Sequence, residues 1–207
     1  DVLLKQAEDA LEKVTGPDVP ADYDALSLLL DVTTEKLGRA WGAVGHLNSV
    51  ADTAELRAAF NENLPRVTEF YTRLGADERL YAKYKALAAS EQGITLSAPR
   101  KRALDNALRG FVLGGAELQG AAKERFAAIQ EQQAALSQSF SEHVMDATDA
   151  FSHYASTEEL AGLPQDVLDA TAAAAQAEGK EGHKLTLHMP CYLPVMQYAT
   201  HRAVRET

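Results

Sequence analysis

Histidines are the residues in this sequence best suited to metal chemistry. The chain has six of them: His46, His143, His153, His183, His188 and His201. A zinc site on a helix needs two ligands on one face, which is the arrangement that HExxH spacing gives. His143 and His153 are expected roughly 80° apart around one helix, and His183 and His188 on opposite faces of a strand. The spacing therefore predicts no metal ligand, and each histidine is interpreted as solvent-exposed or structurally hydrogen-bonded.

Nucleophile and phosphate-binding patterns are also missing from the sequence. Cys191 is the only cysteine, and it lies between a predicted strand and a proline-started helix without a basic cluster to favour the thiolate. We interpret it as a packed side chain. The stretches GGAELQG and EGKEG lack the GK[ST] ending of a phosphate loop and are expected to be turns. No pair of carboxylates is spaced as an acid and base couple. The sequence therefore predicts no catalytic residue and identifies no substrate-binding residue.

The elements that hold these residues are almost all helical, because apolar residues recur every three or four positions along the chain. Predicted helices cover about residues 1–14, 23–48, 53–74, 77–89, 97–113, 121–154, 164–178 and 194–206. Residues 92–96 are expected to form a loop. Only KLTLHMP alternates like a strand, with Leu185 and Leu187 on one face. The predicted fold is an all-α multi-helix array with one short strand segment near the C-terminus, formed by a single helical region, 1–207.

Three glycines in the predicted helix 23–48 call for a physical reason. Gly38, Gly42 and Gly45 fall on one side of that helix, and each costs about 1 kcal/mol relative to alanine in a helix interior. A smooth stripe of this kind is expected where another backbone approaches closely. We therefore predict that this helix is buried on two sides, with His46 at the rim of the stripe. A ligand-binding role for His46 is the alternative.

Composition restricts the partners and the compartment. The formal net charge is -10 and the sequence pI is about 5.0, so nucleic acid and anionic membrane surfaces are not expected partners. A lone cysteine and a charged first segment without a signal-peptide core predict a cytoplasmic location. Both ends of the sequence fall inside helical patterns, from which we expect a piece of a longer protein.

Four stretches carry a family resemblance: GHLNSVADTAELRAAFNENLP, DNALRGFVLGGAEL, HVMDATDAF and LTLHMPCYLPVMQYA. In this order they resemble successive segments of the N-terminal helical region of bacterial members of the thimet oligopeptidase family of zinc metallopeptidases. The resemblance covers nearly the whole chain. It implies a larger, mostly helical, two-lobed enzyme that cleaves short unstructured peptides in a deep channel between its lobes.

In that family, the two histidines of HExxH and a downstream glutamate hold the zinc ion. This chain has no HExxH, so the resemblance implies that the catalytic lobe is absent from it. One zinc ion is expected in the parent enzyme and none in this chain, which would form one wall of the channel and be inactive alone. The expected partners are short peptides and the missing C-terminal catalytic lobe, and the parent is expected to be a monomer.

Two other hypotheses about the function of this chain remain open. The chain could be a stand-alone helical interaction module that binds a partner helix in an apolar groove, for which the long helix predicted over residues 121–154 is the motivation. The isolated piece could also self-associate through an apolar patch that the missing lobe leaves exposed. The complete reading frame separates the first alternative from the peptidase, because only the peptidase continues into HExxH.

Overall fold

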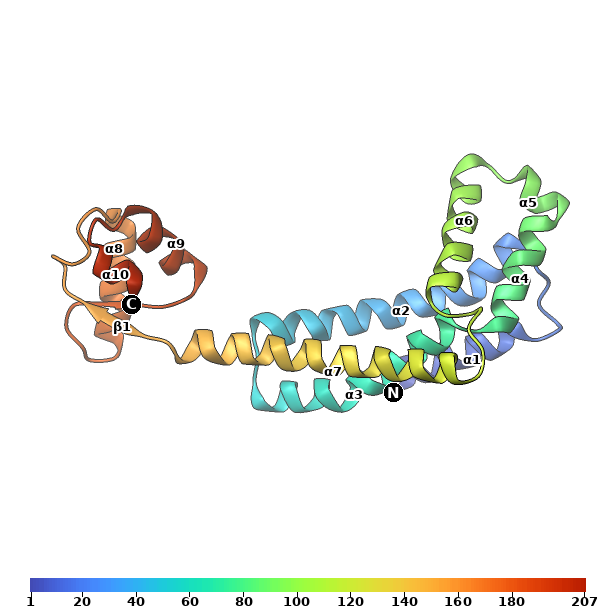
Figure 1. Ribbon diagram of the computed structural model, residues 1–207, viewed down its shortest axis with the longest axis horizontal. Coiled ribbons are helices and arrows are strands. Elements are labelled where there is room, and N and C mark those ends of the chain that lie inside the picture. The colour runs from blue at the N-terminus through green and yellow to red at the C-terminus, as the bar shows by residue number, and fades with distance from the viewer. The chain divides into compact units, whose positions relative to one another are not determined.

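The computed structural model describes residues 1–207 and is predominantly helical, with a single two-stranded sheet (Figure 1). This confirms the predicted all-α fold class. The chain divides into two compact units, which we call the N-terminal unit (Asp1–Gln138) and the C-terminal unit (Ser139–Thr207). None of the helices combines the length and the apolarity that a bilayer crossing requires.

The N-terminal unit is built from helices alone. They are α1 (Val2–Thr15), α2 (Tyr23–Val50), α3 (Ala54–Gly75), α4 (Glu78–Ala89), α5 (Glu91–Thr95), α6 (Ala98–Leu113) and the first part of α7 (Ala121–Ala150). The predicted helices are all present. The loop expected over residues 92–96 is wrong: α5 forms there because the Ser90 side chain accepts a hydrogen bond from the Gly93 N–H and caps the turn.

The core of the N-terminal unit lies where α1 packs on α2, α3 and α4. Four apolar residues at helical spacing along α1 are buried: Leu4, Ala7, Leu11 and Val14. Leu26, Leu30 and Leu37 of α2 are buried against the same core. Their spacing of three or four residues, or its multiples, places them on one side of the helix.

Side-chain caps fix where several helices begin. Thr53 Oγ1 accepts a hydrogen bond from the Leu56 N–H at 3.2 Å, which starts α3 at the predicted position. Asp77 Oδ1 accepts from the backbone N–H groups of Arg79 (2.9 Å) and Leu80 (3.0 Å) and starts α4. Arg79 in turn bridges the carboxylates of Asp77 and Glu12, which ties α4 to α1.

The second half of α2 differs from the prediction. A Cβ placed on Gly42 would meet no atom within 4 Å, and on Gly38 and Gly45 it would meet only the side chains of Tyr71 and Phe60. No other backbone approaches the glycine stripe, so the expectation that α2 is buried on two sides is wrong. The close backbone approach occurs elsewhere, between Gly75 and Gly114, where a Cβ on Gly114 would lie 2.6 Å from the Gly75 carbonyl oxygen.

The C-terminal unit contains the rest of α7, followed by short elements. These are β1 (His153–Ala155), α8 (Gln165–Ala177), β2 (His183–Leu185), α9 (Met189–Tyr198) and α10 (Arg202–Glu206). The strands pair antiparallel, with His153 opposite Leu185 and Ala155 opposite His183. The predicted strand over residues 184–190 is therefore confirmed only at residues 184 and 185: Leu187 lies outside β2, and α9 has already begun at Met189. Its partner β1 was missed because Tyr154 continues the apolar spacing of α7, which ends at Ala150.

The last predicted helix is two helices in the structure. α9 begins earlier than expected, with Pro190 in its first turn and Pro194 inside it. It ends at Tyr198, and the Thr200 N–H donates to the Ala161 carbonyl oxygen before α10 begins. A small core holds the unit together: Ala155, Leu160, Leu163, Leu185, Val195, Ala199 and Val204.

Candidate functional site

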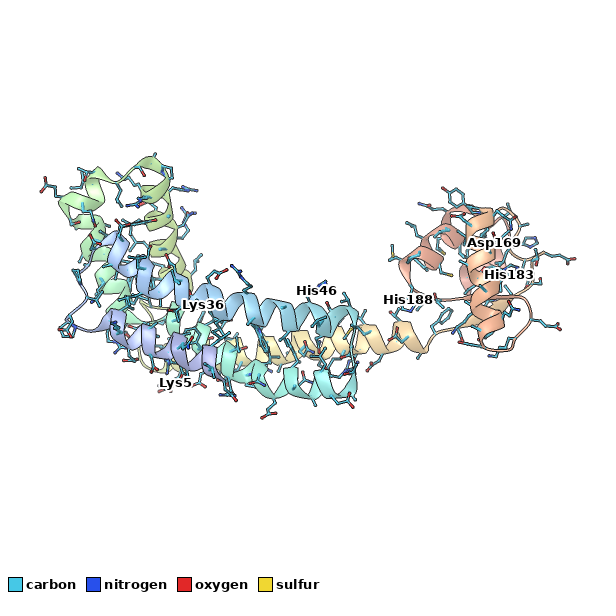
Figure 2. The ribbon with its side chains drawn as sticks, turned by 180° about the vertical axis from the view of Figure 1, so that it is seen from behind. Lys5, Lys36, His46, Asp169, His183 and His188 are labelled. Atoms are coloured by element: carbon cyan, nitrogen blue, oxygen red, sulfur yellow. The ribbon has the colours of Figure 1, made fainter.

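The side chains that could bind a metal ion are dispersed. No three His, Cys, Asp or Glu side chains come together in residues 1–207 in a way that could hold an ion. His46 on α2 and His143 on α7 are exposed. Figure 2 labels His46, His183 and His188, which lie on different elements. His188 is the N-cap residue of α9, not a strand residue, and its Nε2 lies 3.4 Å from Asp149 Oδ1 at the surface.

His183 is the one buried histidine, and its neighbours define a structural role. Its Nδ1 lies 3.0 Å from Thr171 Oγ1 and 3.2 Å from the Leu168 carbonyl oxygen, and its Nε2 lies 3.0 Å from Thr157 Oγ1. Because a carbonyl oxygen only accepts, we assign the ring hydrogen to Nδ1, and Nε2 then accepts from the Thr157 hydroxyl. The interpretation of this histidine as structurally hydrogen-bonded is confirmed.

Cys191 is packed as predicted. It is partly buried on α9 against the core of the C-terminal unit. Its Sγ accepts a hydrogen bond from the Thr186 N–H at 3.3 Å, so the sulfur fixes the chain between β2 and α9.

The N-terminal unit contains a pocket of about 380 Å³, which we call the aromatic pocket. Its walls come from α2, α3, the end of α6 and the beginning of α7. The lining residues are Trp41, Val67, Thr68, Tyr71, Thr72, Gly75, Leu113, Gly114, Phe126 and Gln130. A volume of this size is within the range of small-ligand and side-chain sites.

Contacts behind the lining hold the aromatic pocket in shape. Trp41 stacks on Phe60 of α3 with ring centroids 4.6 Å apart and an interplanar angle of 13°. Tyr71 packs edge-on against the buried ring of Phe70, with centroids 5.2 Å apart. Glycine at both 75 and 114 lets the ends of α3 and α6 approach closely enough to close one side. These contacts place two aromatic side chains on well-packed helices.

The lining of the aromatic pocket carries no charged side chain. Its polar groups are the hydroxyls of Thr68, Tyr71 and Thr72 and the amide of Gln130. Burial raises the pKa of the Tyr71 hydroxyl, which keeps it protonated and able to donate a hydrogen bond. The pocket can therefore accept an apolar group and a few hydrogen bonds.

A second hollow of about 210 Å³ shares Thr72 and Phe126 with the aromatic pocket. Its lining adds charged side chains from α3 and α7, namely Glu69, Arg73, Lys123 and Glu131. The two hollows together follow the line along which α3 and α7 face each other. An uncharged recess and a charged one thus lie next to each other on one surface of the unit.

Sequence reasoning did not find this site. The apolar spacing of α2 is typical of a core-facing helix and includes Trp41, yet this residue is only partly buried and lines the aromatic pocket. Phe126 follows the apolar spacing of α7, a helix in which no residue is buried. The available signal was an aromatic residue on a helix side that also carries glycine, as Trp41 does with Gly38 and Gly45, which are three and four residues away.

Comparison with known proteins assigns the chain to a family. The model of the neurolysin/thimet oligopeptidase N-terminal domain matches residues 1–123. The chain belongs to the neurolysin/thimet oligopeptidase family.

Several relatives are named oligopeptidase A. The Escherichia coli K12 protein is 37% identical over 204 residues, which is 98% of this chain and 30% of that protein. The Haemophilus influenzae protein is 40% identical over 185 residues, 89% of this chain and 27% of its own length. A probable cytosolic oligopeptidase A from Arabidopsis thaliana is 37% identical over 215 residues, 99% of this chain and 30% of its own length.

The family match confirms the family that the four sequence segments predict, and the relatives agree with it. The chain spans about 30% of the length of the Escherichia coli and Arabidopsis relatives. The first 123 residues, which match the N-terminal domain, include α1 to α6 and three of the four helices that line the aromatic pocket.

Proposed function

We propose that this chain is the non-catalytic N-terminal lobe of a zinc metallo-oligopeptidase that hydrolyses short peptides, and that it forms one wall of the substrate channel. The observation that carries the proposal is the coverage: relatives named oligopeptidase A align over 98% of this chain but only 30% of their own length. The residues present here do not fit a zinc site, since no three potential ligands come together. The zinc ligands of the parent are therefore assigned to polypeptide outside this chain.

The aromatic pocket supports the wall role. A peptidase that accepts varied short peptides needs surfaces that hold apolar side chains without demanding a particular charge. Trp41, Tyr71 and Phe126 offer such a surface on rigid helices, and the neighbouring charged hollow can meet polar side chains or a peptide terminus. In this proposal the N-terminal lobe contributes binding and exclusion of folded proteins, while another part of the parent performs the chemistry.

Two measurements test the division of labour. The purified 1–207 chain is expected to bind no stoichiometric zinc and to leave a quenched fluorescent peptide uncut. The parent protein encoded by the complete reading frame is expected to carry HExxH, to bind one zinc ion and to cut the same peptide. Turnover by the 1–207 chain alone would refute the non-catalytic assignment.

A further measurement tests the wall role in the parent enzyme. Tyr71→Ala and Phe126→Ala remove apolar contact worth about 1–2 kcal/mol each, so KM for peptides with large apolar side chains is expected to rise on the order of tenfold. Zinc content should not change. Leu28→Ala, which alters an exposed side chain of α2 outside the pocket, is the matched control. Equal KM values in all variants for every peptide would show that the aromatic pocket does not line the substrate channel.

A stand-alone interaction module is the second candidate, and one observation favours it. α7 has no buried residue, although Ile129, Leu136, Phe140 and Val144 follow helical spacing along it and are exposed. An apolar stripe of this kind can receive a partner helix. The reading frame separates the two candidates: termination after Thr207 supports the module, and continuation into HExxH supports the peptidase.

A further inference from the structure

α9 (Met189–Tyr198) differs in composition from the other helices of the chain. Its sequence, MPCYLPVMQY, contains no charged residue. A helix that is apolar all round is normally buried on all sides. In this structure Val195 is its only fully buried residue, and Cys191 is partly buried beside it. One side of α9 thus covers the small core of the C-terminal unit, and the apolar residues on its other side are exposed.

The uncovered side forms one continuous apolar surface, which we call the α9 face: Leu187, Met189, Tyr192, Leu193 and Met196. Within α9 the spacing i, i+3, i+4, i+7 from Met189 to Met196 places four of these residues in a stripe about 100° wide. Their exposed fractions run from 39% for Leu187 to 60% for Met189. An amphipathic helix in an ordinary monomer would carry polar residues at these positions.

The α9 face lies next to the C-terminal residues of the described chain. Leu187, Tyr192 and Met196 also line a small apolar hollow whose other walls include Val204 and Thr207. Any polypeptide that follows Thr207 therefore starts at the edge of this surface. The relatives have about 70% of their length outside the matched region, because 204 aligned residues make up 30% of the Escherichia coli protein.

The core of the C-terminal unit is also small for its length. Seven buried apolar residues form it in a unit of residues 139–207. A domain of this size buries a limited share of its surface, and additional covering of an apolar face adds about 25 cal/mol for each Å² removed from water. Covering the α9 face is therefore a source of stability that this unit lacks when residues 1–207 are considered alone.

We infer that the α9 face is the docking surface for the part of the parent polypeptide that follows Thr207. The inference rests on the proposed function, in which this chain is the N-terminal lobe of a longer peptidase. Met and Tyr side chains suit such a contact, because they fill irregular apolar gaps and keep a polar atom available at the rim. A second copy of this chain and a peptide substrate are the competing occupants, and the experiment distinguishes them.

The test compares the 1–207 chain with the full-length parent by oxidation of methionine with hydrogen peroxide. Met189 and Met196 are exposed in the 1–207 chain and should oxidise at rates close to that of free methionine added as the reference. In the parent, both rates are expected to fall at least tenfold, as read by peptide mass spectrometry. Equal rates in the two proteins would overturn the inference.

The same experiment identifies the competing occupants. Protection in the 1–207 chain that increases with its concentration would assign the α9 face to a second copy and overturn docking of the parent. Protection of the parent that appears only after a non-hydrolysable peptide is added would assign the face to substrate, with the same consequence. Peptide cleavage is assayed on the same parent sample, so that the docking inference and the proposed peptidase function can fail separately. Cleavage without protection of the methionines overturns docking at the α9 face alone. Protection of the methionines without cleavage overturns the peptidase function alone.

A charge variant provides an independent measurement. Leu193→Glu places a carboxylate on the α9 face, where it is solvated in the 1–207 chain but would be buried in the parent. We expect an unchanged Tm in the 1–207 chain and a fall of about 5 °C or more in the parent. Ala173→Glu, at an exposed position of α8 outside the face, is the matched control and should change neither. Identical Tm values for the two parent variants would contradict docking at this face.

Discussion

Two glycine substitutions in the N-terminal unit should have opposite effects on stability. Gly42 lies inside α2, and a Cβ placed there would meet no atom within 4 Å. Gly114 follows α6 with an ordinary helical backbone (φ -77°), but a Cβ there would lie 2.6 Å from the Gly75 carbonyl oxygen and 3.0 Å from its carbon. Alanine therefore fits without strain at position 42 and forces a displacement at position 114.

The magnitudes follow from these two environments. Replacing Gly42 by alanine gains the difference in helix propensity, about 0.8–1.0 kcal/mol, with no packing change to offset it. At position 114, the new methyl group must push the end of α3 away by several tenths of an ångström, which costs about 1–3 kcal/mol in a packed interior. Any gain in helix propensity at 114 is small, because that residue is the C-cap of α6 rather than an interior position.

Unfolding of the N-terminal unit can be followed by the fluorescence of Trp41, the only tryptophan in the chain. We expect Gly42→Ala to raise Tm by about 3–5 °C and Gly114→Ala to lower it by a similar or larger amount. A loss of stability in Gly42→Ala would mean that another backbone does pack on the glycine stripe. A neutral Gly114→Ala would show that α3 and α6 are not held together at Gly75.

Three further substitutions test the buried polar contacts and the caps. His183→Ala should destabilise the C-terminal unit by about 2–4 kcal/mol, because it opens a cavity and removes the hydrogen bonds of the ring to Thr157 and Leu168; an unchanged urea midpoint by circular dichroism would contradict this role. Burial by itself would raise the pKa of the Asp77 carboxyl, but hydrogen bonds from Arg79 and the α4 backbone outweigh burial and hold this pKa below its usual value. The ionised Asp77 side chain therefore stabilises the fold above about pH 4. This contribution is lost as the pH falls through the folded-state pKa. Asp77→Asn should accordingly be less stable at pH 7 and lose less stability between pH 7 and pH 3, measured as urea midpoints; an identical pH dependence would argue against the ion pair. Thr53→Ala should cost about 1 kcal/mol through loss of the α3 cap, and restoration by Thr53→Ser but not by Thr53→Val is the check.

Local signals account for the part of the fold that the sequence predicts correctly. The predicted starts of the helices at about residues 53 and 77 are close to those of α3 and α4, because a capping side chain acts within three residues of its own position. Helical spacing alone places Leu4, Ala7, Leu11 and Val14 together on one side of α1, and all four are buried. Caps and spacing fix where a helix begins and which of its sides is apolar.

Features that depend on distant partners were missed. β1 has three residues and exists because it pairs with β2, whose residues are about thirty positions away, so no local pattern marks it. Helical spacing showed that Gly38, Gly42 and Gly45 share a side of α2, but it could not show what lies opposite them. The aromatic pocket requires four helices to be placed around Trp41 and Phe126. Its residues carry no motif, because their contribution is shape rather than reactivity.

The two hydrophobic cores follow one another along the chain without interleaving. The first uses residues from Leu4 to Ala116, and the second uses residues from Ala155 to Val204. A ribosome therefore completes every residue of the first core roughly 90 codons before the last residue of the second. At about 5–20 residues per second, that interval is roughly 4–18 s, which is ample time for a helical unit with mostly local contacts to fold. The N-terminal unit can thus be folded while the remainder of the polypeptide is still being translated. Segments that are translated later can then pack against an already folded unit.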